Sequence, residues 1–94
     1  MLILNLAIKS DILISKLLKK GIMKNRYVEI SKSRLFQFQD QIPWTKINQV
    51  VEFGSSYGDT LEEIGVKNKV KNLIGFDLQK PTNNKIKFYK EDLN

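Results

Sequence analysis

The sequence contains no cysteine and no histidine in its 94 residues. The lack of cysteine excludes disulfides and thiolate metal sites, and the lack of histidine removes the commonest general base and the commonest metal ligand. We therefore expect no metal site, and any catalysis must use Lys, Asp, Glu, Tyr or a bound cofactor. A hydrophobic fraction of 41% is ordinary for a globular chain, and this length allows one small domain at most.

The chain also lacks the features of an export signal or a membrane span. Its first eight residues are mostly apolar, but no basic segment precedes them and no small-residue cleavage site follows. The run is too short to cross a bilayer. We therefore expect a cytoplasmic protein without membrane insertion. Met23 is an alternative to Met1 as the translation start, and it would make residues 1–22 an upstream extension.

The net charge of +6 lies wholly in the first half of the chain. Residues 1–50 hold nine Lys or Arg and three Asp or Glu, whereas residues 51–94 hold seven of each class. A basic half beside a neutral half fits a partner that is an anionic polymer such as RNA. A solubilising surface would produce the same bias, so RNA binding through the N-terminal half is one of two interpretations.

Two helices are expected in the N-terminal half, and residues 1–8 could be a strand or the first turn of a helix, which periodicity does not decide. The Ser-Asp pair at residues 10–11 can cap an amphipathic helix that ends near Gly21, and packing of this helix on its own domain is favoured over binding to a membrane or to RNA. A second, short helix is expected to end at about Gln41. These segments divide the first half into a basic amphipathic extension (residues 1–22) and a helical lead-in (residues 23–47).

The last segment, residues 48–94, contains three short apolar runs that predict parallel strands. They cover residues 48–53, 72–77 and 85–90, and a helix over residues 59–65, ending at its glycine, connects the first two. This alternation predicts an α/β fold with a partial Rossmann-like sheet of about three parallel strands, preceded by N-terminal helices. Each run leads into a carboxylate, so the acids would meet at one edge of the sheet, where such folds bind nucleotides.

The turn after the first of these strands contains Gly54 and Gly58. Glycine tolerates a left-handed backbone and admits a ligand closely, although tight strand-to-helix packing explains it as well. Glu52 beside the turn would repel a pyrophosphate and suit a cationic ligand. Asp77 can accept from ribose hydroxyls and Asp92 from an adenine amino group, with a turn cap and a solvated chain end as alternatives. S-adenosylmethionine, which has an adenosine part and a positive centre, satisfies all three acids.

Three segments also carry a resemblance to a known family. The segments VVEFGSSYG (residues 50–58), IGFDL (residues 74–78) and FYKEDL (residues 88–93) resemble, in order and spacing, the first three motifs of the class I S-adenosylmethionine-dependent methyltransferases. The resemblance covers about residues 48–94, and it implies S-adenosyl-L-methionine as the cofactor.

The family resemblance implies a role for each motif residue. It puts Gly54 and Gly58 at the methionine end of the cofactor. Asp77 would contact the ribose, and Asp92 would lie near the adenine. The full set of implied cofactor-binding residues is Glu52, Gly54, Ser55, Ser56, Tyr57, Gly58, Asp77, Leu78, Asp92 and Leu93.

A narrower resemblance is to the FtsJ-like RNA 2′-O-methyltransferases. Residues 32–36 (KSRLF) are similar to the Ser-Arg segment of that family, and residues 77–81 with residues 91–92 are similar to another of its segments. Two positions depart from its pattern. Tyr57 stands where a proline is usual, and residues 37–39 (QFQ) occupy the neighbourhood of the catalytic lysine. The catalytic residues are therefore unassigned, and RNA is one candidate acceptor.

The third expected strand lies close to the last residue of the sequence, whereas a complete doubly wound sheet has more strands. We therefore expect the cofactor-binding portion of an S-adenosylmethionine-dependent methyltransferase, truncated and completed by a longer form or by a second chain. The alternative is a non-catalytic remnant or interaction module that keeps the half-fold without turnover.

Overall fold

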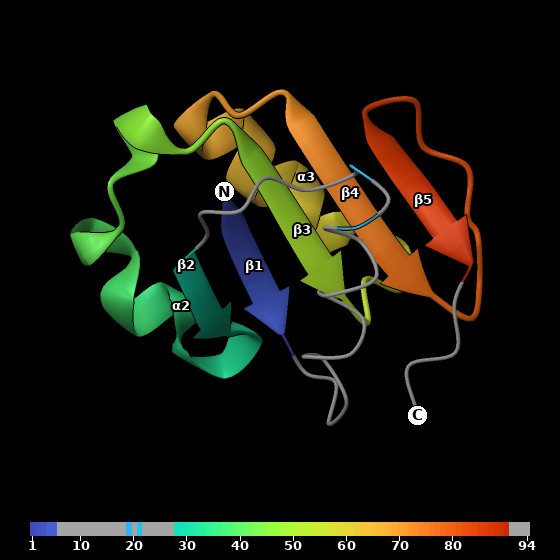
Figure 1. Cartoon of the computed structure of the whole chain (residues 1–94), viewed down its shortest axis with the longest axis horizontal. Helices are drawn as coiled ribbons and strands as arrows, with labels where there is room; N and C mark the ends of the chain where they lie inside the picture. The colour runs from blue at the N-terminus through green and yellow to red at the C-terminus, as the bar shows by residue number, and fades with distance from the viewer. Residues whose placement is uncertain (6–18, 20, 22–27, 91–94) are drawn as a thin grey trace.

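The computed structural model describes residues 1–5, 19, 21 and 28–90 (Figure 1). In this part of the chain, five strands form one parallel sheet with the order β2-β1-β3-β4-β5. Of the helix expected between residues 10 and 21, the structure describes only Lys19, which is helical, and Gly21, which has a left-handed backbone with φ +71°. The elements are β1 (Leu2–Asn5), β2 (Val28–Ser31), α2 (Lys32–Phe38), the 3-10 turns η1 (Gln39–Gln41) and η2 (Trp44–Lys46), β3 (Gln49–Phe53), α3 (Asp59–Asn68), β4 (Asn72–Asp77) and β5 (Ile86–Lys90).

The α/β class and the parallel sheet are confirmed, but the sheet has five strands rather than about three. β3, β4 and β5 lie within one residue of the predicted segments, and α2 with η1 covers the predicted short helix. Of the two additional strands, β1 lies in residues 1–8, where a strand and the first turn of a helix were both open, and β2 lies in a segment predicted as helical. Leu2, Ile3 and Leu4 of β1 are all completely buried, so this short strand has no alternation of apolar and polar residues that would identify it.

The strand order places a topological switch point between β1 and β3. The chain leaves β1 toward β2 on one side, and it leaves β3 toward β4 and β5 on the other. Because the strands are parallel, their carboxyl ends share one edge, and sheets of this kind bind ligands there, at the switch point. Read from the other side, the order β5-β4-β3-β1-β2 is that of strands 3-2-1-4-5 in a dinucleotide-binding sheet. β1 and β2 therefore stand where such a sheet has its fourth and fifth strands.

Both faces of the sheet are buried. On one face, Leu35 of α2 and Leu61 and Ile64 of α3 belong to a single cluster with side chains of β1, β3, β4 and β5. On the opposite face, Phe53 and Phe76 are also buried, with ring centroids 5.3 Å apart. Burial on two faces explains why the strands read as continuous apolar runs in the sequence.

Helix α3 is longer than expected because Gly65 does not end it. The helix continues to Asn68 and ends where Lys69 adopts a left-handed backbone with φ +58°. A Cβ at Gly65 would stand 2.6 Å from Leu73 Cδ1 and 2.9 Å from the Val70 carbonyl oxygen. Glycine is therefore required by the close approach of α3 to β4, and the prediction that it stops the helix is wrong.

Candidate functional site

The segment between β3 and α3 is a tight turn with three left-handed residues. Gly54, Ser56 and Gly58 have φ values of +78°, +52° and +85°. The Gly58 N–H donates to the Ser55 carbonyl oxygen (2.9 Å), and the Glu62 N–H donates to the Gly58 carbonyl oxygen (2.9 Å). The turn therefore closes directly onto the first turn of α3, at the carboxyl edge of the sheet.

The two glycines of this turn have different surroundings. A Cβ at Gly58 would stand 2.6 Å from Ile86 Cδ1 and 2.9 Å from Phe88 Cζ, so glycine is needed where the start of α3 packs on β5. At Gly54, no atom of the described residues lies within 4 Å of the same position. Close packing therefore explains Gly58, whereas no described residue crowds Gly54.

Asp77 joins the end of β4 to this turn. Its Oδ2 accepts a hydrogen bond from the Ser56 N–H (2.8 Å), and its Oδ1 accepts one from the Leu78 N–H (2.7 Å). The carboxylate thus caps the left-handed residue of the turn, which is the alternative role considered for it. A carboxylate has about four acceptor positions, so the half-buried Asp77 can cap the turn and still accept bonds from a ligand.

The backbone of β4 holds the turn as well. The N–H groups of Gly54 and Ser55 both donate to the Phe76 carbonyl oxygen, at 2.8 and 3.2 Å. The Ser55 side chain is buried, and a Cβ at Gly75 would stand 2.5 Å from its Oγ. Gly75 therefore makes room for Ser55 beneath the turn. Sequence reasoning missed this role of Gly75, although a glycine inside an apolar strand signals a close approach.

Glu52 does not lie at the surface of the turn. It is completely buried, and the register places it between Leu4 of β1 and Gly75 of β4, on the face that α2 and α3 cover. A carboxylate in such a position needs polar partners, because the loss of hydration is costly. Its side chain is therefore part of the interior beneath the turn and not of the surface that a ligand meets at the edge.

Two large side chains are exposed at this edge. Tyr57 follows the capped Ser56 and is 63% exposed, and Leu78 follows Asp77 and is 53% exposed. Ligand sites combine apolar side chains with a few polar groups, so these two side chains are available to contact a ligand beside Asp77. Asp92 and Leu93, the other two expected cofactor contacts, lie outside the described residues.

The candidate site is therefore the open surface formed by Gly54, Ser56, Tyr57, Asp77 and Leu78, the carboxyl-edge site. It offers a carboxylate acceptor, backbone groups of a glycine turn and two exposed apolar side chains. Within the part of the chain that the structure describes, no cluster of acidic residues could hold a metal ion. The described helices are also too short or too polar for a membrane span.

Comparisons with known proteins return no match for this chain, whether with protein families, with curated proteins or with solved structures. The functional argument therefore rests on the geometry of the carboxyl-edge site and on the sequence motifs.

Proposed function

We propose that the chain binds S-adenosylmethionine at the carboxyl-edge site and forms the cofactor-binding part of a methyltransferase. One observation carries the proposal. The glycine turn after β3 and the carboxylate at the end of β4 are in direct contact, through the 2.8 Å bond from the Ser56 N–H to Asp77 Oδ2. They meet beside the switch point, at the edge where parallel sheets bind nucleotides.

The proposed roles follow from the exposed groups of the site. The remaining acceptor positions of Asp77 suit the two hydroxyls of a ribose. The side chains of Tyr57 and Leu78 can cover the two faces of an adenine. Gly54 has no Cβ, and no described residue lies where one would stand, so the methionine part can approach the backbone. When bound, S-adenosylmethionine supplies an electrophilic methyl group, and the chain contributes by orienting it toward an acceptor, for which RNA is a candidate.

The buried position of Glu52 favours a second candidate function. With its side chain completely buried, this carboxylate does not face the positive centre of a cofactor at the surface. A non-catalytic module that keeps the parallel sheet but transfers no methyl group would not need a contact between Glu52 and that positive centre. The two candidates differ in turnover and not in fold.

The first test is a calorimetric titration of the full chain with S-adenosylmethionine, with S-adenosylhomocysteine as the comparison. Saturable binding of both ligands, lost in Asp77→Ala and kept in the exposed control Lys80→Ala, is the expected result. No binding by a chain whose circular dichroism is that of an α/β fold would refute the cofactor proposal. Transfer of labelled methyl from the cofactor to RNA then separates the enzyme from the non-catalytic module.

A further inference from the structure

A pocket lies at the amino-terminal edge of the sheet, opposite the carboxyl-edge site. It has a volume of about 330 Å³ and lies between α3, the turn before β4 and the loop before β5. We call it the amino-edge pocket, and define it by Val66, Val70, Lys71, Asn84 and Lys85. Because α3 runs antiparallel to the strands, its last turn is far from the glycine turn. The amino-edge pocket is therefore separate from the carboxyl-edge site.

The described connection between β4 and β5 places no helix over the amino-edge pocket. The connection from β4 to β5, residues 78–85, is described throughout and contains no helix. Its floor is apolar, since Val70 and Leu73 are buried residues that line it, and Val66 stands at its side with 68% of its surface exposed. A volume of this size is at the lower end of the range for pockets that hold small ligands.

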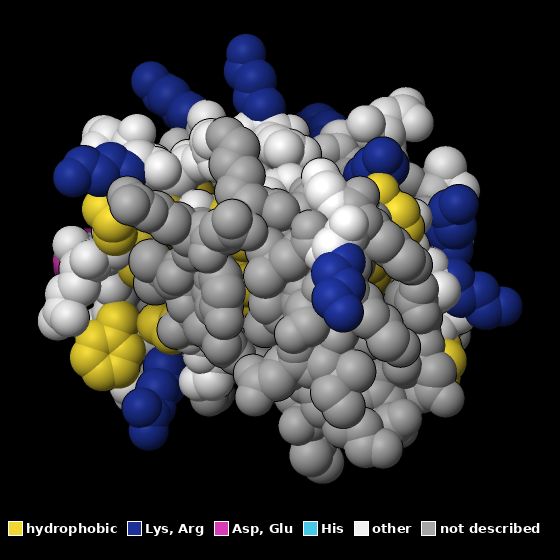
Figure 2. Space-filling model, in the orientation of Figure 1, with side chains coloured by type: hydrophobic (Ala, Val, Ile, Leu, Met, Phe, Trp, Pro, Cys, Tyr) yellow, Lys and Arg dark blue, Asp and Glu magenta, His cyan; other side chains and the backbone are white. Residues whose placement is uncertain are grey.

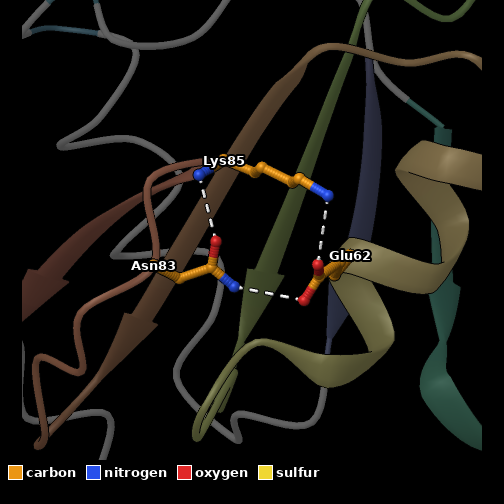
Figure 3. A network of polar contacts seen from close by, with 3 residues as sticks. All are labelled: Glu62, Asn83 and Lys85. Carbon is orange, nitrogen blue, oxygen red and sulfur yellow. Dashed lines mark hydrogen bonds and ion pairs between the residues drawn. The ribbon is translucent and has the colours of Figure 1, made fainter.

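The polar side of the pocket is held in place by a network (Figure 3). Lys85 Nζ contacts Glu62 Oε1 at 3.4 Å, and Asn83 Nδ2 donates to Glu62 Oε2 at 3.2 Å. The Lys85 N–H also donates to Asn83 Oδ1 at 3.0 Å. These contacts tie the loop before β5 to α3 and hold the Lys85 ammonium at the pocket. The neighbouring amide of Asn84 can both donate and accept.

Further lysines lie at the amino-terminal edge of the sheet. Lys46 precedes β3, Lys67, Lys69 and Lys71 lie at the end of α3 and in the turn before β4, and Lys85 precedes β5. Of these, only Lys71 and Lys85 line the amino-edge pocket, and Lys67 Nζ donates to Gln39 Oε1. Figure 2 shows Lys and Arg side chains projecting along the upper edge of the view, where β3, β4 and β5 of Figure 1 begin.

The helix dipole does not explain this whole group of lysines. It accounts for Lys67, in the last turn of α3, but not for Lys71 and Lys85, which lie outside the helix. Glu62 offsets part of the charge of Lys85, whereas Lys71 has no ion pair with a carboxylate of the described residues. A positive charge is therefore available beside the apolar floor.

We propose that the amino-edge pocket binds a nucleotide, either free or as one unit of an RNA strand. The base would rest on the apolar floor beside Val66, with Asn84 bonding to its edge. Lys71 and Lys85 would hold the phosphate, since ammonium–phosphate bonds are charge-assisted. This inference does not depend on the proposed cofactor function, because it uses other residues at the other edge of the sheet.

The test measures fluorescence anisotropy of a short labelled oligouridylate with the full 94-residue chain, and uses AMP and inorganic phosphate as competitors. The test variant is Lys71→Ala with Lys85→Ala. The matched control is Lys80→Ala with Lys90→Ala, which removes the same charge from exposed positions outside the pocket. A third variant, Val66→Asp, puts a carboxylate beside the floor at an exposed position. Circular dichroism checks that every variant keeps the fold.

We expect Lys71→Ala with Lys85→Ala to weaken binding by about tenfold. The slope of log affinity against log salt should fall by about 0.7, the value for one phosphate contact on a single strand. Val66→Asp should weaken binding as well, and the control pair should change it less than about twofold. Competition by AMP at lower concentration than phosphate would support a base-binding floor. Equal losses from the two lysine pairs, no binding at all, or equal competition by phosphate and AMP would each overturn the proposal. If AMP displaces all of the labelled oligouridylate, the ligand is a free nucleotide. If AMP displaces only part of it, the ligand is one unit of an RNA strand.

Discussion

At the scale of single residues, Asp77 combines a structural and a proposed binding role. Removing its carboxylate in Asp77→Ala leaves the Ser56 N–H of a left-handed residue without its acceptor, so we expect unfolding free energy to fall by about 1–2 kcal/mol. Cofactor affinity should fall by a further 1–3 kcal/mol, the approximate effect of losing hydrogen bonds to a charged acceptor. Urea denaturation measures the first effect and calorimetry the second. Asp77→Asn should have an intermediate stability, because its single amide oxygen can accept from only one of the two N–H groups, those of Ser56 and Leu78. Equal affinity in wild type and Asp77→Ala would remove Asp77 from the site.

The two glycines of the turn give a second prediction at this scale. Gly54→Ala and Gly58→Ala both force a side chain into a left-handed backbone, which costs about 1–2 kcal/mol. Only Gly58→Ala also meets side chains of β5, at 2.6 and 2.9 Å, so we expect it to be less stable than Gly54→Ala by about 1 kcal/mol or more. Urea denaturation of both variants measures the difference. A larger loss for Gly54→Ala would contradict the packing seen at the two positions.

At the scale of elements, the packing of α3 on β4 reverses a general rule. Replacing glycine by alanine inside a helix stabilises it by about 1 kcal/mol. At Gly65 the new Cβ would stand 2.9 Å from a backbone oxygen, which cannot move as a side chain can. We therefore expect Gly65→Ala to lower the melting temperature. The control Val66→Ala, on the exposed side of the same helix, should leave it unchanged or slightly higher. A higher melting temperature for Gly65→Ala would mean that α3 and β4 are farther apart.

The elements also differ in how well the sequence predicts them. β3, β4 and β5 are recognisable because each is an apolar run next to a turn or a loop. β1 is not, because the successive buried residues Leu2, Ile3 and Leu4 show no period, and its pairing with both β2 and β3 is a long-range property. The glycine turn and Asp77 were predictable from their spacing, but the bond between them depends on the register of β3 and β4. The burial of Glu52 likewise depends on which face the helices cover.

At the scale of the whole molecule, the two proposed sites lie at opposite edges of one sheet. Strands of five or six residues separate the edges by about 20 Å, at roughly 3.3 Å per residue. A single nucleotide cannot reach from one site to the other, whereas an RNA strand can. The amino-edge pocket would therefore anchor a substrate strand and not place the accepting atom. The sequence suggested RNA binding through the first half of the chain, where the excess positive charge lies. In the proposed arrangement, the lysines that bind RNA are instead Lys71 and Lys85, in the second half.

The position of β1 also bears on whether translation from Met23 would give the same molecule. β1 is hydrogen-bonded to β2 on one side and to β3 on the other, so a chain of residues 23–94 would lack the strand that joins these two. Leu2, Ile3 and Leu4 are completely buried, and loss of such side chains costs about 2–5 kcal/mol each, comparable together to the whole stability of a small domain. We expect the 23–94 chain to lose cooperative thermal unfolding by calorimetry. The milder variant Leu4→Ala should still unfold cooperatively at a lower temperature, and the exposed control Leu78→Ala should match the wild type. A cooperative transition in the 23–94 chain at the wild-type temperature would mean that β1 is not part of the stable sheet.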